Sequence, residues 1–296
     1  MALERAMSER FVTRFAPSPT GMLHLGHAFS ALTAWEAAKA AAGKFLLRIE
    51  DIDRTRSRPE YETAIYEDLA WLGVTWSGSV WRQSERLGVY AAALERLDSL
   101  GVTYPCRCTR ADIRAALSAP QEGTTQLPPG GAVYPGTCRG RDMAECGAGD
   151  AIRLDLDRAL ALLGGRPLTW RETGPDHAGT HILEPAVLRR RIGDVVLARK
   201  DIGAAAYHLA VVVDDAAKGV THVIRGEDLL EATAIHRMIQ ALLDLSVPVW
   251  HHHRLVRDET GRRLAKRDGA WAIRTYRAEG RTPADIWLMA GAQSSR

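Results

Sequence analysis

The stretch from Arg14 to His27 reads RFAPSPTGMLHLGH, and it decides the fold that we expect for this chain. The residues Val12 to Ala16 read as a short strand, and the two prolines that follow stiffen a turn. A helix is expected to open at His24 and to run to about Ala42. A strand, a tight turn and a helix in this order form the first unit of an α/β domain.

The segment HLGH places His24 and His27 on one face of that helix, three residues apart. A helix start offers unpaired backbone N–H groups and a positive dipole, and two imidazoles there add donors for an anion such as a triphosphate. Gly26 has no side chain, so a flat base can lie close to the backbone. The alternative is an ordinary helix whose histidines cap or pack.

A second cationic segment, RLAKRD from Arg263 to Asp268, lies near the other end of the chain. The stretch around it holds Arg262, Arg263, Lys266 and Arg267 just after a turn. Such a run alone is typical of a solvated face. Paired with HLGH, it predicts a split site for a nucleotide.

The two segments, in this order, resemble the HIGH and KMSKS signatures of class I aminoacyl-tRNA synthetases. The blocks FLLRIEDIDRTRS, WRQSER, YHLAVVVDD and GVTHVIRGEDLL look like the catalytic core of glutamyl-tRNA synthetases. The resemblance implies a doubly wound parallel, Rossmann-type α/β catalytic domain. RLAKR departs from the family pattern by an arginine at 263 and an alanine at 265, and it keeps Lys266.

The order of elements predicts a catalytic domain interrupted by an insertion. We expect helices at 59–73, 87–100 and 228–243, and strands at 44–49, 195–197, 209–213 and 220–224, with a hairpin turned by residues 201–203. The expected divisions are a first catalytic half at 1–105, an inserted zinc-containing acceptor-binding domain at 106–187, a second catalytic half at 188–250, and a lysine-loop segment with a short tail at 251–296.

The chain ends at Arg296, soon after the lysine segment, so we expect no anticodon-binding domain. It resembles a short form of the family that activates L-glutamate with ATP and attaches it to the queuosine base in the anticodon of tRNA(Asp). The expected partners are ATP, L-glutamate and the anticodon stem-loop of tRNA(Asp). Two alternatives are a minimal glutamyl-tRNA synthetase that charges a 3′ end and a catalytically inactive RNA-binding paralogue.

A glutamate site needs cations for the carboxylates and an anion for the ammonium group. The resemblance assigns glutamate binding to Arg14, Phe15, Ala16, Pro17, Ser18, Glu50, Tyr207 and Arg225. Local alternatives are an Arg14–Glu50 pair, a core role for Tyr207 and a surface pair between Arg225 and Glu227.

The predicted nucleotide site joins both cationic segments. His24, His27 and Lys266 are expected to stabilise the charge of the phosphates, and His24, Gly26, His27, Arg263 and Lys266 to bind ATP. Mg²⁺ is expected to arrive with ATP. Asp51 and Asp53 could bind a metal, although the arginines that follow favour a salt-linked loop. For the pair Asp214 and Asp215, a metal site and turn aspartates are both open.

Three cysteines have a spacing typical of a structural zinc site. Cys106 and Cys108 form a C-x-C pair, and Cys138 supplies a third thiol on a later turn, whereas Cys146 falls outside the pattern. The alternative is a set of unrelated buried cysteines. The resemblance adds Tyr134 as the fourth ligand, and His177 or His181 could take that place.

Composition agrees with an enzyme of the cytoplasm. The 296 residues carry a formal net charge of +3, and 46% of them are hydrophobic, enough for a sizeable core. The charged N-terminus lacks the apolar segment of a signal peptide, and no apolar run reaches membrane-spanning length. We expect a monomer without a membrane partner. The basic clusters Arg54–Arg58 and Arg189–Arg191 are candidate RNA contacts or solvated faces.

Overall fold

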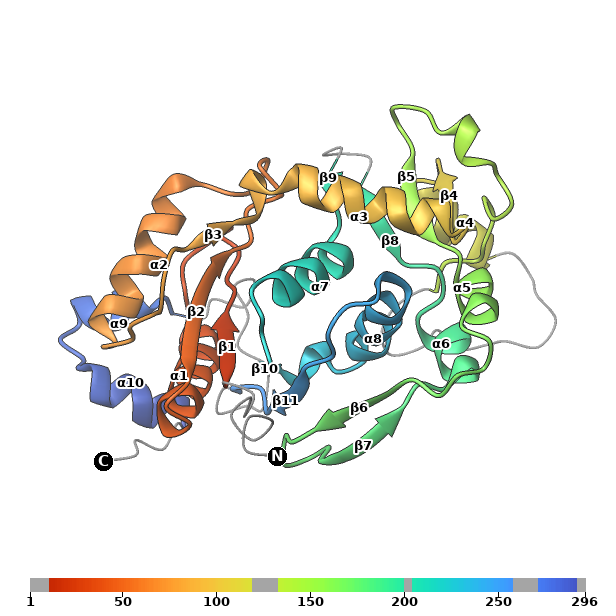
Figure 1. Ribbon diagram of the computed structural model, residues 1–296. Coiled ribbons are helices and arrows are strands. Elements are labelled where there is room, and N and C mark those ends of the chain that lie inside the picture. Colours follow the sequence, from red (N-terminus) through yellow and green to blue (C-terminus); the bar gives the residue numbers. More distant parts are fainter. Residues whose placement is uncertain (1–10, 119–132, 200–203, 258–270, 292–296) are drawn as a thin grey trace.

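The computed structural model describes residues 11–118, 133–199, 204–257 and 271–291 (Figure 1). The helices are α1 Leu25–Ala40, α2 Pro59–Trp71, α3 Leu87–Ser99, α4 Arg110–Ser118, α5 Leu156–Leu162, α6 Pro185–Arg191, α7 Tyr207–Ala217, α8 Ala232–Leu243, α9 Ile273–Ala278 and α10 Pro283–Ala290. The strands are β1 Val12–Phe15, β2 Lys44–Ile49, β3 Trp81–Arg82, β4 Thr103–Cys106, β5 Ala151–Leu154, β6 Thr169–Glu172, β7 Gly179–Ile182, β8 Val196–Arg199, β9 Ala204–Ala205, β10 His222–Gly226 and β11 Val249–His253.

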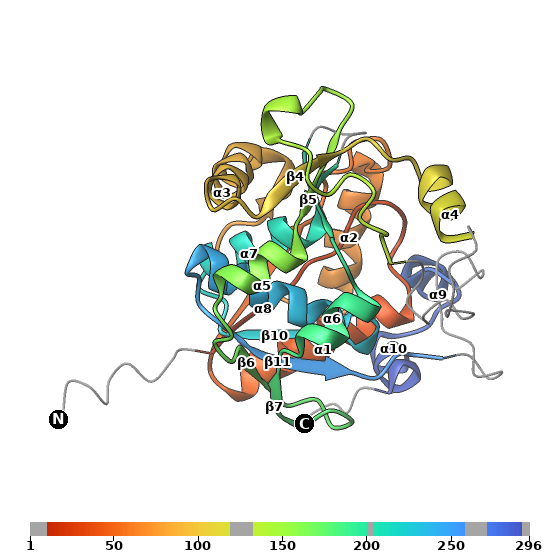
Figure 2. The ribbon, with the colours of Figure 1, turned by 90° about the vertical axis from the view of Figure 1, so that its right-hand side faces the viewer.

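Parallel strands form the centre of the molecule, as predicted. β2 pairs in parallel with β1 and β3, and β10 pairs in parallel with β11. The two groups meet where the backbone N–H of Thr221 donates to the carbonyl of Val12 at 2.9 Å. β6 runs parallel to β11, on the side of β11 away from β10. It forms an antiparallel hairpin with β7 (Figure 2).

The central strands bury both of their faces. Val12 and Leu46 belong to one hydrophobic core with α3, α7 and α8, whereas Phe45 and Leu47 belong to a second core with α1, α2 and α10. Side chains alternate between the faces of a strand, so helices cover both sides of β1 and β2. This arrangement explains the nearly continuous apolar run of β2. It also agrees with the doubly wound architecture expected from the sequence.

Two sequence-based expectations are wrong. Residues 209–213 are not a strand but the middle of α7, where they are all buried. A short apolar run that is buried on every side looks alike in a helix and in a strand, so its pattern could not separate them. Residues 195–197 do not resume the parallel sheet, because β8 lies in an antiparallel sheet of order β4-β5-β8-β9. This sheet lies at the opposite end of the molecule from α2 and α10 (Figure 1).

The chain reverses between β8 and β9, where Ala198 lies opposite Ala205. This agrees with the hairpin expected there, although the turn at residues 201–203 lies outside the described part of the chain. Within the described ranges, no helix is both long and apolar enough to cross a bilayer.

A buried cluster of charges joins α7 to the sheet and to α3. Asp214 is fully buried and accepts hydrogen bonds from Arg86 Nε at 2.7 Å, Tyr90 OH at 2.8 Å and Gln83 Nε2 at 3.2 Å. The next residue, Asp215, pairs with arginines of β1 and β2. The two aspartates therefore lie in a helix and not in a turn, and the pairing of their carboxylates with arginines anchors that helix.

We expect Asp214→Asn to lower the free energy of unfolding by about 3 kcal/mol, measured by urea denaturation. The carboxylate accepts from Arg86, Tyr90 and Gln83, and Arg48 Nε lies 3.8 Å from it, so an amide NH₂ at this position would face donors and leave the arginines without its charge. Tyr90→Phe is the matched control, because it removes one hydrogen bond and no charge and should cost only about 1 kcal/mol. Equal losses in the two variants would contradict the role of the charge.

Candidate active site

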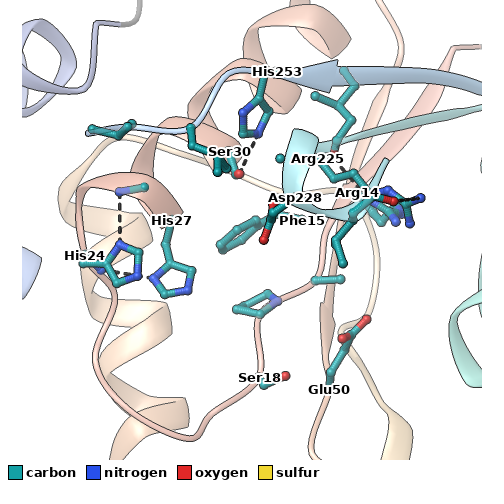
Figure 3. A pocket seen from close by; sticks show the side chains of 18 of the residues that line it. Arg14, Phe15, Ser18, His24, His27, Ser30, Glu50, Arg225, Asp228 and His253 are labelled. Carbon is teal, nitrogen blue, oxygen red and sulfur yellow. Dashed lines mark hydrogen bonds between the residues drawn. The ribbon is translucent and has the colours of Figure 1, made fainter. Parts of the chain in front are cut away.

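A cavity of about 380 Å³ lies where β1 and β10 end and α1 begins. All eight predicted glutamate-binding residues line it, together with His24, Gly26 and His27. Figure 3 places the two histidines at one side of the cavity and Arg14 and Arg225 at the other. The predicted ATP residues Arg263 and Lys266 lie outside the described residues. The structure thus brings together the predicted residues that it describes, although it does not test their roles.

The two histidines form the N-terminal cap of α1. His24 Nδ1 accepts from the backbone N–H of Gly26 at 3.1 Å, and His27 Nδ1 accepts from the N–H of His24 at 3.2 Å. The capping alternative is therefore confirmed. It leaves the anion-binding prediction standing, since a neutral ring that accepts at Nδ1 carries its proton on Nε2. A side chain at Gly26 would begin 3.0 Å from the His24 ring, so that ring would have to shift by a few tenths of an ångström.

Arg14 is bound to a carboxylate, but to a different one from the sequence alternative. Its Nε donates to Asp215 Oδ1 at 3.0 Å, whereas Glu50 pairs with Arg48 at 2.9 Å. Arg14 and Arg48 lower the pKa of Asp215, although burial opposes its charge. Burial raises the pKa of Glu50, and Arg48 opposes that effect. Arg14 and Glu50, which line the cavity, are therefore each in direct contact with an oppositely charged side chain.

Arg225 is buried in a different environment, and the surface pair with Glu227 is not formed. Its donors meet neutral acceptors: His252 Nε2 at 3.0 Å, His236 Nδ1 at 3.2 Å, Thr233 Oγ1 at 2.9 Å, the Leu229 carbonyl at 3.0 Å and, more distantly, Tyr207 OH at 3.5 Å. Burial lowers the pKa of Arg225, because the ion loses its hydration. Among the described residues, no carboxylate pairs with it. Its positive charge can serve a ligand.

The sequence interpretation missed several residues that line the cavity, among them Ser30, Asp228 and His253. His253 ends β11, where its Nε2 lies 2.7 Å from Ser30 Oγ and its Nδ1 lies 2.9 Å from the Arg254 carbonyl. A carbonyl only accepts, so the proton is on Nδ1 and the Ser30 hydroxyl donates to Nε2. The strand β11 was not predicted from the sequence, and the run HHH at residues 251–253 was the available signal.

The loop at Asp51 and Asp53 is salt-linked, as the sequence favoured. Asp53 accepts from Arg56 at 2.7 Å and from Arg199 at 3.1 Å, and Asp51 accepts from the backbone and the hydroxyl of Ser84. Both carboxylates are therefore used in holding the chain segments together.

Three thiols and a phenol meet away from the cavity. The sulfurs of Cys106, Cys108 and Cys138 lie within 4.8 Å of one another. The hydroxyl of Tyr134 is 3.4 Å from Cys106 Sγ and 3.5 Å from Cys108 Sγ. Ligands at about 2.0 to 2.3 Å from a tetrahedral ion are about 3.3 to 3.8 Å apart, so these spacings suit zinc.

The histidine alternatives for the fourth position are not supported. His181 stacks on Trp170 in the β6–β7 hairpin and contacts the carbonyl of His177. Within the described ranges, the metal-ligand group around these thiols contains no histidine. Cys146 is exposed and lies outside the cluster, as the spacing predicted.

Comparison with known proteins defines the class. Residues 10–127 and 183–290 match the family model "tRNA synthetases class I (E and Q), catalytic domain". The chain therefore belongs to the class I tRNA synthetase family for glutamate and glutamine, which confirms the resemblance seen in the sequence. It is 56% identical to the glutamyl-Q tRNA(Asp) synthetase of Rhodobacter capsulatus, across 95% of this chain and 99% of that protein.

Solved structures agree with the family. The glutamate-tRNA synthetase of Elizabethkingia anophelis matches 95% of this chain with a TM-score of 0.75 and 28% identity, and the chain spans 61% of that protein. A methionyl-tRNA synthetase of Mycobacterium tuberculosis, at 10% identity and a TM-score of 0.59, shares the fold.

The contrast between the two arginines of the cavity is testable through stability. We expect Arg14→Gln to cost about 2 kcal/mol more in the free energy of unfolding than Arg225→Gln, because only the first change leaves a buried carboxylate short of a partner. Losing Arg225 also relieves a buried charge, which offsets its lost hydrogen bonds. Urea denaturation without added glutamate measures both. A larger loss for Arg225→Gln would show that Arg225 is compensated in the folded protein.

Proposed function

We propose that the protein activates L-glutamate with ATP and transfers the glutamyl group to the queuosine base in the anticodon of tRNA(Asp). The observation that carries this proposal is the 56% identity to a glutamyl-Q tRNA(Asp) synthetase over nearly the whole of that relative. The cavity adds independent support, since a helix N-terminus for phosphates faces a buried arginine that has no carboxylate partner in the part of the chain that the structure describes.

The amino acid occupies the side of the cavity that holds the two arginines. Arg225 binds the side-chain carboxylate, and its uncompensated charge favours glutamate over the neutral amide of glutamine. Tyr207 starts α7 beside it. Glu50 receives the ammonium group, and Arg14 with the segment Phe15, Ala16, Pro17 and Ser18 frames the rest of the substrate.

ATP occupies the side of α1. The N-terminus of α1 and the imidazoles of His24 and His27 stabilise the phosphates, with Gly26, Arg263 and Lys266 completing the site and Mg²⁺ accompanying the nucleotide. The α-carboxylate oxygen of glutamate attacks the α-phosphorus of ATP. The bond to the bridging oxygen breaks, and pyrophosphate leaves. Catalysis is positioning and charge stabilisation, so no protein nucleophile is needed.

In the second step, a hydroxyl of the queuosine ring attacks the carbonyl carbon of glutamyl-adenylate. An ester forms, and AMP leaves with the electrons of the broken carbon–oxygen bond. The hydroxyl loses its proton as the ester forms, and the mixed anhydride of glutamyl-adenylate is replaced by a lower-energy ester, so the step needs no further energy source.

We also propose that the region 106–187 is an inserted domain that holds Zn²⁺ and takes part in acceptor binding, within a monomeric, cytoplasmic enzyme. The family model leaves residues 128–182 unmatched, which supports an insertion. Cys106, Cys108, Tyr134 and Cys138 would hold the ion. Zinc would link two turns that lie about 30 residues apart in the chain and so stabilise the fold.

We expect Cys108→Ser to lose bound zinc and to lower the midpoint of thermal unfolding, because metal binding is coupled to folding. Atomic absorption gives the metal content, and calorimetry gives the midpoint. Cys146→Ser is the matched control, since this exposed thiol lies outside the cluster, and it should keep zinc and stability. Wild-type protein that is fully stable without metal would refute the zinc assignment.

The acceptor is tested with tRNA(Asp) that lacks its 3′-terminal adenosine. We expect this RNA to accept glutamate fully, because the anticodon base is the acceptor, whereas an unmodified transcript with guanosine in place of queuosine should accept none. Labelled glutamate retained on the RNA measures both. Charging that needs the 3′ adenosine but not queuosine would favour a minimal glutamyl-tRNA synthetase, a function suggested by the structural match to that class of enzyme.

A further inference from the structure

A buried chain of hydrogen bonds leads from Glu172, at the end of β6, through His252 of β11 to Arg225 of β10. We propose that Glu172 and His252 are positioning residues for glutamate selection, because they hold Arg225 through a neutral imidazole acceptor and so leave its charge to the substrate. This inference rests on the proposed function and adds two residues to its specificity.

Glu172 fixes the position of the proton on His252. Its Oε1 accepts from the backbone N–H groups of Thr173, Gly174 and His252 at 3.0, 2.7 and 2.9 Å, and its Oε2 contacts His252 Nδ1 at 2.5 Å. A carboxylate only accepts, so Nδ1 carries the proton. Hydrogen bonds from His252 and from Gly174 lower the pKa of Glu172 to about 2, although burial opposes its charge.

The remaining ring nitrogen of His252 must then accept from Arg225. Nε2 lies 3.0 Å from Arg225 Nε, which can only donate. Protonation of both ring nitrogens would set two donors against each other. In keeping with this, burial and the charge of Arg225 lower the pKa of His252, and only the contact with Glu172 opposes them.

A pair of neutral imidazoles, His236 and His208, holds Arg225 in a similar way. His236 Nδ1 lies 3.2 Å from Arg225 Nη1 and therefore accepts, and its Nε2 then donates to His208 Nδ1 at 3.1 Å. Burial and the charge of Arg225 lower the pKa of both rings, that of His208 to about 4. Arg225 is thus oriented from two sides without direct neutralisation, in contrast to Arg14, which contacts Asp215.

Glu172 lies in the part of the chain that the family model does not match. Residues 128–182 lie outside the two segments that match the family model, yet Glu172 is connected through His252 to Arg225, which lines the cavity. The segment interpreted from sequence as part of an acceptor-binding insertion therefore also shapes the amino-acid site.

Glu172→Gln tests the inference sharply. An amide oxygen at Oε1 would keep the three backbone hydrogen bonds and turn the NH₂ group toward His252 Nδ1. His252 would move its proton to Nε2, where it would oppose Arg225. We expect the KM for glutamate to rise about tenfold in ATP–pyrophosphate exchange, with kcat and the KM for ATP changed less than twofold and discrimination against glutamine reduced.

Electrostatics alone predicts the opposite sign, because removal of a negative charge near Arg225 would tighten glutamate binding. The direction of the KM change therefore separates positioning from charge. Asp194→Asn is the control for lost stability: Asp194 is as buried as Glu172, and Tyr104, Arg139 and the backbone N–H of Leu156, which donate to it, lie away from the cavity. This variant should leave the KM for glutamate unchanged.

His252→Gln gives a matched background, since its amide oxygen can accept from Arg225 whatever residue stands at 172. We expect Glu172→Gln to change the KM for glutamate less than twofold in that background. Histidine ¹⁵N NMR provides a readout apart from activity. The signal of His252, identified by its loss in His252→Gln, should show a proton on Nδ1 in the wild-type protein and on Nε2 in Glu172→Gln.

The outcomes distinguish this inference from the proposed function. A wild-type protein without glutamate-dependent exchange would overturn the proposed function. Normal wild-type exchange with an unchanged or lowered KM in Glu172→Gln, or an equal rise for glutamate and ATP, would overturn only the positioning role. If Glu172→Gln does not fold, the wild-type tautomer decides: a proton on His252 Nε2 refutes the inference, and a proton on Nδ1 supports it.

Discussion

Buried charge is the constraint on which this structure depends. Asp214 and Asp215 of α7 hold arginines from β1, from β2 and from the N-cap of α3, so one helical turn fixes three parts of the domain. Isolated charges in such a place would cost several kcal/mol each, and only direct pairing makes their burial tolerable. The same pairs fix Arg14 and, through Arg48, Glu50 on the cavity wall. The same buried ion pairs therefore stabilise the fold and fix the shape of the site.

One buried arginine of the cavity, Arg225, forms no ion pair with any of the described residues. Arg225 is as buried as Arg14 but rests on imidazoles, a hydroxyl and a carbonyl. Proteins accept such a cost where a ligand completes the pairing, which is why unbalanced ions gather at functional sites. The structure therefore separates two kinds of arginine that look alike in the sequence. One supports the fold, and the other is available to substrate.

The sequence predicted local features well and distant partners poorly. α1 and α2 follow from their caps and prolines, and the motifs around Arg14, Glu50 and Arg225 predicted the residues that line one cavity. The helix α7 was mistaken for a strand because an apolar run buried on every side has no periodicity to interpret. The contact of Glu172 with His252 joins residues 80 positions apart, and no local spacing signals such a pair.

The chain from Glu172 to Arg225 also has a practical consequence for work in solution. A carboxylate at one end and a guanidinium at the other form a buried dipole whose positive end lies on the cavity wall. Small anions of the medium, such as acetate, citrate or sulfate, meet the same field as the substrate and compete for the same donors. Apparent affinities measured in such buffers would be lower than those in chloride or in zwitterionic media. The choice of counter-ion thus becomes an experimental variable.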